Sequence, residues 1–186
     1  VNCFCIPGNH GRIGKKGEHG PTDNYDYLTY HLMKERLRQY PNVNFCIPKS
    51  MFMLVEVQGR IFYMTHGGEV RSWMGIPYYG LDRARSRIVE MMAEHEVYPD
   101  YFITAHVHQQ TTIKERHFTN GDWAGGNDFS VGKLNQASRP MQFLFSVHKD
   151  YGVTWRTPIL LENPTIKKNI KIFKGGQNGK SNRASK

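Results

Sequence analysis

The chain has 186 residues, of which 39% are hydrophobic and 22% are charged, and its formal net charge is +9. This composition is typical of one globular domain with a hydrophobic core, and it excludes fibrous, collagen-like and low-complexity proteins. No apolar run approaches the roughly 20 residues of a membrane-spanning helix, and no basic segment followed by an apolar one opens the sequence, so we expect neither a membrane protein nor an exported one.

The positive charge is concentrated at the carboxyl end. Residues 164–186 carry seven basic residues and no acidic one, whereas residues 1–163 carry 18 basic and 16 acidic residues. We therefore predict a nearly neutral folded domain over 1–163 and a basic, disordered tail over 164–186. Such a tail is either merely solvated or helps to hold a polyanion such as nucleic acid.

Cysteine usage indicates a reducing compartment. Cys3, Cys5 and Cys46 are an odd number without a CxxC pair, which favours neither a disulfide framework nor a structural zinc cluster. A cytoplasmic location fits best, which would be the host cytoplasm if the protein is viral.

Apolar runs alternate with helical patterns along the chain, which predicts an α/β fold. Two helices are expected, over 25–39, capped by Asp23 or Asn24, and over 81–96. The expected strands cover 2–6, 43–47, 51–57, 60–65, 100–104, 111–116, 141–148 and 152–158.

Polar side chains follow three of these strands directly. They are Asn9 with His10, then His66, then His106 with His108. Because the carboxyl ends of strands form the binding edge of an open α/β sheet, these side chains can converge. Imidazole nitrogen and amide oxygen suit divalent ions such as Mn, Zn or Fe, so the pattern indicates a metal site. The remaining histidines are predicted to be structural, namely His19, His31, His95, His117 and His148.

Three motifs carry a resemblance to a known family. Gly8-Asn9-His10, Thr65-His66-Gly67 and Ala105-His106-Val107-His108 resemble, in that order, the last three motifs of the calcineurin-like metallophosphoesterases. The resemblance runs from residue 1 to about residue 162 and implies a four-layer α/β/β/α sandwich with a dinuclear metal centre. The stretches 142–145 and 155–159 are similar to bacteriophage variants of this family.

The resemblance also implies roles for individual residues. Asn9, His66 and His106 would bind one divalent ion and His108 the other, with Mn as the first choice and Zn, Fe or Mg as alternatives. A hydroxide bridging the two ions would attack a phosphate ester, with His10 as the catalytic acid beside the scissile bond. Arg12 and Arg71 are further candidates for contacts with the substrate phosphate.

Two features depart from the family pattern. The DxH and GDxxD motifs that would supply an Asp, a His and a bridging Asp do not precede the GNH motif, so we expect the carboxyl-terminal portion of such an enzyme, lacking its amino-terminal βαβ part. In addition, Gly11 stands where the family has an acidic residue. The residue that orients His10 is therefore open among Glu18, Asp23 and Asp26.

Three functions remain in competition. The leading hypothesis is a metal-dependent phosphodiesterase or nuclease, favoured by the basic tail, by the arginines at 83, 85 and 87, and by the aromatics at 73, 78 and 79. A second is a fragment or one half of a split enzyme that acts as a binding module without catalysis of its own. A third is a nucleic-acid-binding protein that acts through its tail.

Overall fold

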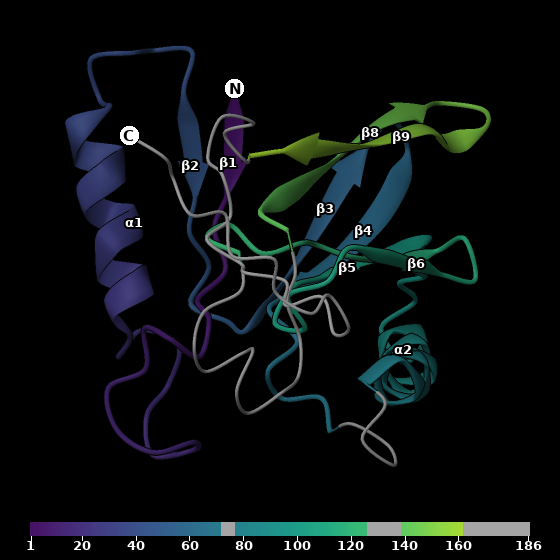
Figure 1. The fold of residues 1–186 in the computed structure, drawn as a ribbon, viewed down its shortest axis with the longest axis horizontal. Helices are drawn as coiled ribbons and strands as arrows, with labels where there is room; N and C mark the ends of the chain where they lie inside the picture. The colour runs from purple at the N-terminus through teal and green to yellow at the C-terminus, as the bar shows by residue number, and fades with distance from the viewer. Residues whose placement is uncertain (72–76, 126–138, 162–186) are drawn as a thin grey trace, which may run out of the picture.

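The computed structural model describes residues 1–71, 77–125 and 139–161, which form two helices and nine strands. The helices are α1 (Tyr25–Arg36) and α2 (Pro77–Ala93), and the strands are β1 (Asn2–Phe4), β2 (Asn44–Cys46), β3 (Phe52–Val57), β4 (Arg60–Thr65), β5 (Tyr101–Thr104), β6 (Thr111–Ile113), β7 (His117–Thr119), β8 (Met141–His148) and β9 (Gly152–Leu160). Figure 1 shows α1 on one outer side, beside β1 and β2, and α2 on the opposite side, next to β5 and β6. The expected α/β sandwich is confirmed. Neither of the described helices is long and apolar enough to span a bilayer.

The largest sheet has the strand order β3-β4-β5-β7-β6. Its three inner strands, β4, β5 and β7, run parallel, whereas the edge strands β3 and β6 are antiparallel to their neighbours. Two smaller pairs complete the described fold: β1 pairs with β2 in parallel, and β8 and β9 form an antiparallel hairpin. Within the described residues the other edge of β1 has no partner strand.

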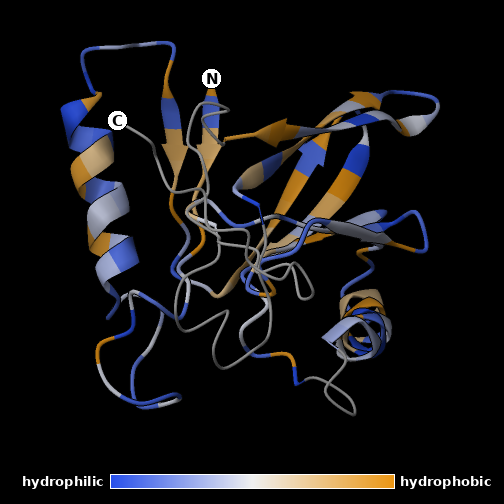
Figure 2. Cartoon of the chain, in the orientation of Figure 1, coloured by the Kyte–Doolittle hydropathy of each residue, from blue (hydrophilic) through white to orange (hydrophobic). Residues whose placement is uncertain are grey.

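The hydrophobic core lies between the hairpin and one face of the large sheet. Phe62, Phe118 and Val153 are almost fully buried, and Phe143 and Phe145 of β8 pack against them. The ring centroids of Phe118 and Phe143 are 5.4 Å apart, within the range of favourable aromatic pairs. Burial of each phenylalanine contributes roughly 2 kcal/mol, so this layer anchors the hairpin. Figure 2 shows the hydrophobic residues gathered on the strands and mostly hydrophilic outer loops.

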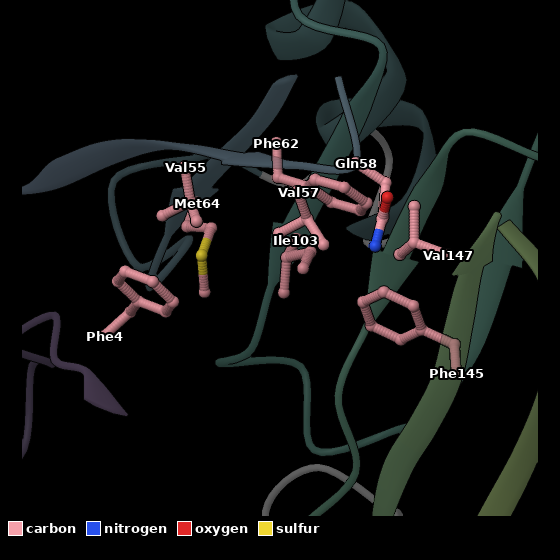
Figure 3. Close-up of a pocket in the computed structure, with 9 residues that line it drawn as sticks. All are labelled: Phe4, Val55, Val57, Gln58, Phe62, Met64, Ile103, Phe145 and Val147. Atoms are coloured by element: carbon pink, nitrogen blue, oxygen red, sulfur yellow. The ribbon is translucent and has the colours of Figure 1, made fainter. Parts of the chain in front are cut away.

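An apolar cavity of about 340 Å³ remains between the large sheet, β8 and the end of β1 (Figure 3). Its lining consists of Phe4, Val55, Val57, Gln58, Phe62, Met64, Ile103, Phe145 and Val147. Gln58 is the only polar side chain among these lining residues, and none of the histidines in the three motifs contributes to the lining. This cavity is therefore separate from the predicted metal site.

The structure corrects one strand assignment. The strand expected over 111–116 is wrong, because Lys114 and Glu115 both take the left-handed backbone conformation, with φ of 49° and 59°. They turn the chain so that β6 is followed at once by β7, which the sequence analysis did not find. The helix ends also differ: α1 stops at Arg36 rather than at 39, and α2 spans 77–93 rather than 81–96. The expected tail and the aromatic at position 73 lie outside the described residues.

The opposite face of the sheet contains a buried histidine. His117 on β7 is 2% exposed, its Nε2 lies 3.0 Å from Thr104 Oγ1, and its Nδ1 has no hydrogen-bond partner in the described part of the chain. Burial, with a smaller contribution from the positive charge of Arg85, lowers the pKa of His117 to about 4. His117 is thus neutral and structural, as the sequence analysis predicted.

We predict that stability falls as the pH decreases from 6.5 to 4. In that window the unfolded chain protonates residue 117 and the folded chain does not, so the proton favours the unfolded state. The contribution of His117 amounts to about 3 kcal/mol by pH 4. Urea unfolding at a series of pH values measures the free energy of unfolding. In His117→Gln the fall of this free energy between pH 6.5 and pH 4 should be smaller by the contribution of His117. An equal slope in both proteins would contradict the prediction.

Candidate metal centre

Four loops of the candidate site leave the carboxyl ends of strands at one edge of the fold. They follow β1, β4, β5 and β7, and because β4, β5 and β7 are parallel, their loops emerge on the same side. Backbone hydrogen bonds join neighbouring loops: Ala105 N–H donates to His66 O at 3.0 Å, and Asn120 N–H donates to Thr104 O at 2.7 Å. The relative positions of the loops after β4, β5 and β7 are therefore fixed by the main chain.

Three side-chain atoms from three of these loops meet at one point. Asn9 Oδ1 lies 2.6 Å from His66 Nε2 and 3.1 Å from His106 Nδ1, and the two ring nitrogens are 3.2 Å apart. Ligand atoms that share a metal ion at about 2.1 Å lie roughly 3 Å from one another. This donor set, one amide oxygen and two imidazole nitrogens, fits a divalent ion of the Mn, Fe or Zn type.

The electrostatic environment keeps both imidazoles neutral. Burial lowers the pKa of His66 to about 4, with further lowering by His106 and His10. Burial also lowers the pKa of His106, followed by the effects of His108 and His10. Neutral imidazoles have a lone pair, so both rings are in the form that binds metal ions at neutral pH.

The donor set contains no carboxylate. Across residues 1–71, 77–125 and 139–161, no three His, Cys, Asp or Glu side chains are grouped so that they could hold a metal ion. The cluster combines two histidines with an asparagine, so Asn9 is essential to it. A second ion would need ligands beyond this cluster.

His10 and His108 lie next to each other at the side of the cluster. Their ring centroids are 6.2 Å apart. His10 is exposed, whereas the His108 side chain is 35% exposed and its Nδ1 lies 3.1 Å from Asp122 Oδ2. No role is predicted for Asp122 from the sequence. It follows β7, and because that strand was not predicted, no strand-end signal pointed to this residue.

The His106–His108 segment is held in a strained backbone conformation. His106 and His108 have φ values of 66° and 56°, and Val107 N–H donates to Ala105 O at 2.7 Å between them. The left-handed region costs a non-glycine residue about 1–2 kcal/mol. Strain of this kind is concentrated at functional sites, where the surrounding structure imposes it.

The amino terminus of α1 holds the loop that presents Asn9. Asn24 is the N-cap: its Oδ1 accepts a hydrogen bond from Asp26 N–H at 2.8 Å, which settles the choice between Asp23 and Asn24. Its Nδ2 donates to Gly8 O at 2.9 Å, and Gly8 N–H donates to Asp26 Oδ2 at 2.8 Å. The cap thus also fixes the GNH loop.

The same contacts explain the glycine at position 11. A Cβ at Gly11 would lie 2.5 Å from Asp26 Cγ and 2.6 Å from Asp26 N, so no side chain fits there. An acidic residue at this position is therefore incompatible with the cap. None of the three residues considered as partners of His10 hydrogen-bonds to it within the described ranges. Asp26 accepts from Gly8 N–H, Glu18 accepts from Lys15 N–H, and the Asp23 side chain is exposed.

The two predicted substrate arginines have different positions. Arg12 lines the same hollow as Asn9 and His66, and its Nη2 lies 3.5 Å from Glu69 Oε1. Lys16 Nζ pairs with the other oxygen of Glu69 at 2.9 Å. Arg71 is exposed, and within the described residues it makes no hydrogen bond or ion pair with the cluster. Arg12 is therefore beside the cluster, whereas Arg71 is not brought to it.

No family model and no curated protein matches the chain. Two crystal structures of Vps29 from Entamoeba histolytica are similar to it at low levels. A single mutant of that protein has 11% identity and a TM-score of 0.44 over 86% of this chain and 99% of its own. The wild type complexed with Zn²⁺ has 12% identity and a TM-score of 0.41 over 86% and 97%. At these values the two structures do not identify a family for this chain.

We predict that Asn24→Ala destabilises the fold and loosens the cluster. The substitution removes the N-cap and the donor to Gly8 O, for an expected loss of about 2–3 kcal/mol in the free energy of unfolding. Chemical denaturation measures the loss, and Asp23→Ala, which changes the exposed neighbour, is the control. Equal stability of the two variants would mean that the cap does not support the loop.

Proposed function

We propose that this chain is a metal-dependent phosphoesterase of the calcineurin-like type, acting on phosphodiesters such as those of nucleic acids. The observation that carries the proposal is the meeting of Asn9 Oδ1, His66 Nε2 and His106 Nδ1 within 3.2 Å of one another. The three side chains come from separate loops that are far apart in sequence. Hydrogen bonding alone does not require that two neutral imidazoles lie in contact. A shared metal ion does, because both rings must direct a lone pair at it.

The three converging atoms would hold one divalent ion, with Mn as the first choice, and His108 would contribute to a second. Bound divalent ions neutralise the charge of a phosphate ester and lower the pKa of water. The chain's own contribution is to fix the donor atoms by the cap at Asn24 and by the bonds between the loops. Such rigid support is what a metal centre needs.

His10 is proposed as the acid that protonates the leaving oxygen. It follows Asn9 directly, is exposed, and has no hydrogen-bond partner within the described ranges, so its ring is free to meet a substrate. Arg12 and Lys16 supply positive charge beside the cluster for a substrate phosphate. Glu69, which pairs with both, would have to release them for the phosphate to bind.

A specific observation also favours the second hypothesis, that the site is completed by another polypeptide segment. The cluster has no carboxylate in the described part of the chain, and a carboxylate is the usual bridging ligand of a two-metal site. The edge of β1 that has no partner strand among the described residues, together with the apolar cavity next to Phe4, offers a place for an additional strand. We propose that this strand delivers the missing carboxylate to the edge where Asn9 lies.

We predict that the isolated chain binds about one Mn²⁺ ion and that His66→Ala abolishes the binding, because the ion loses one of three ligands. Elemental analysis after desalting measures the stoichiometry. His95→Ala, which changes an exposed histidine at the end of α2, should retain the ion. Two ions per chain would mean that the site is complete without a further segment, and none in any protein would reject the metal centre.

We predict that His10→Gln lowers kcat for a phosphodiester by about 10²-fold or more while the bound metal is unchanged, because only proton donation is lost. His106→Ala should abolish both metal and activity. Hydrolysis of a dinucleotide, whose alkoxide leaving group needs a proton, tests both variants. Full activity of His106→Ala would refute the assignment.

A further inference from the structure

Asp122 is a largely buried carboxylate beside the cluster, with both oxygens engaged. Its side chain is 13% exposed, and Oδ2 lies 3.1 Å from His108 Nδ1. Oδ1 accepts a hydrogen bond from Ala124 N–H at 3.0 Å, which closes a short turn. The carboxylate therefore has one orientation, with Oδ2 directed at the histidine ring.

The loop that carries Asp122 is fixed at both ends. Asn120 N–H donates to Thr104 O at the end of β5, and Met141 N–H donates to Asp122 O at 2.8 Å at the start of β8. Gly121 packs closely against β8, since a Cβ there would lie 2.5 Å from Met141 Cγ. Asp122 thus stands on a rigid support, as a residue that orients a ligand requires.

The contact determines which ring nitrogen of a neutral His108 carries the proton. An ionised carboxylate only accepts hydrogen bonds, so Nδ1 must donate. The lone pair of the neutral ring is then on Nε2, the atom on the far side of the ring from Asp122. Carboxylates are common partners of metal-binding histidines for this reason.

We propose that Asp122 is a positioning residue that holds His108 as the Nδ1–H tautomer and so offers the Nε2 lone pair to a divalent ion. The part of the proposal that concerns the ion rests on the proposed function. The tautomer follows from the contact between Asp122 and His108 alone. His106, two residues earlier, directs its Nδ1 into the cluster instead. The two histidines of one strand-end segment thereby present opposite nitrogens.

Asp122→Asn is the decisive variant because it keeps the size of the side chain and reverses the direction of the hydrogen bond between residue 122 and His108 Nδ1. The amide oxygen can retain the bond from Ala124, which turns the NH₂ group toward His108 Nδ1 and drives the proton to Nε2. Long-range ¹H–¹⁵N spectra of the histidine rings, assigned with His108→Gln and recorded where imidazoles are neutral, read the tautomer. We expect Nδ1–H in the wild type and Nε2–H in Asp122→Asn.

Asp150→Asn is the matched control. Its carboxylate faces His148 Nδ1 at 4.0 Å on the exposed β8–β9 turn, so the signals of His108 should not change. If Asp122→Asn does not fold, Asp122→Leu tests the same point, because without an acceptor the ring should become a mixture of tautomers. An Nε2–H ring in the wild type, or the same tautomer in the wild type and the Asp122 variant, would overturn the inference.

A zinc titration separates this inference from the proposed function. Added Zn²⁺ should first shift the signals of His66 and His106, which hold the one ion that survives desalting. At higher zinc the Nε2 signal of His108 should shift in the wild type, and Asp122→Asn should need at least about 10-fold more zinc for that second response. A His108 signal that responds at no zinc concentration, while His66 and His106 respond, would overturn the inference. No response at any histidine, with the tautomer difference intact, would reject the proposed metal centre instead.

Discussion

The parallel alignment of β4, β5 and β7 is the constraint on which the candidate site depends. Because these strands share a direction, His66, His106 and Asp122 leave the sheet at the same edge although 40 and 56 residues separate the first from the other two. The hydrogen bonds from Ala105 to His66 and from Asn120 to Thr104 then join the loops. The main chain thus brings the polar side chains together before any ligand binds them.

The second support comes from outside this sheet. Asn9 lies in the loop that follows β1, and β1 pairs only with β2 in the described structure, so the large sheet does not position Asn9. The cap of α1 positions Asn9, because Asn24 donates a hydrogen bond to Gly8 O and Asp26 accepts one from Gly8 N–H. One asparagine therefore links the start of a helix to the loop that carries Asn9, and the close packing leaves no room for a side chain at Gly11.

The sequence pattern predicts the converging side chains of the candidate site better than it predicts the sheet. Asn9, His66 and His106 were identified because each follows an apolar strand directly, and strand ends of this kind depend on local pattern alone. The strand β7 was missed because its three residues, His-Phe-Thr, contain one apolar side chain and the turn before it uses Lys114 and Glu115 rather than glycine. With β7 missing, Asp122 had no assigned place. Its contact with His108 depends on tertiary packing that no local pattern encodes.

The left-handed backbone at His106 and His108 sets stability against the proposed role of their side chains. Glycine occupies that conformation without the penalty that a side chain incurs, so replacing either histidine with glycine would relax the main chain by about 1 kcal/mol while deleting an imidazole of the proposed site. The two imidazoles are therefore held at a cost in stability that the rest of the domain tolerates, as the proposed site would require.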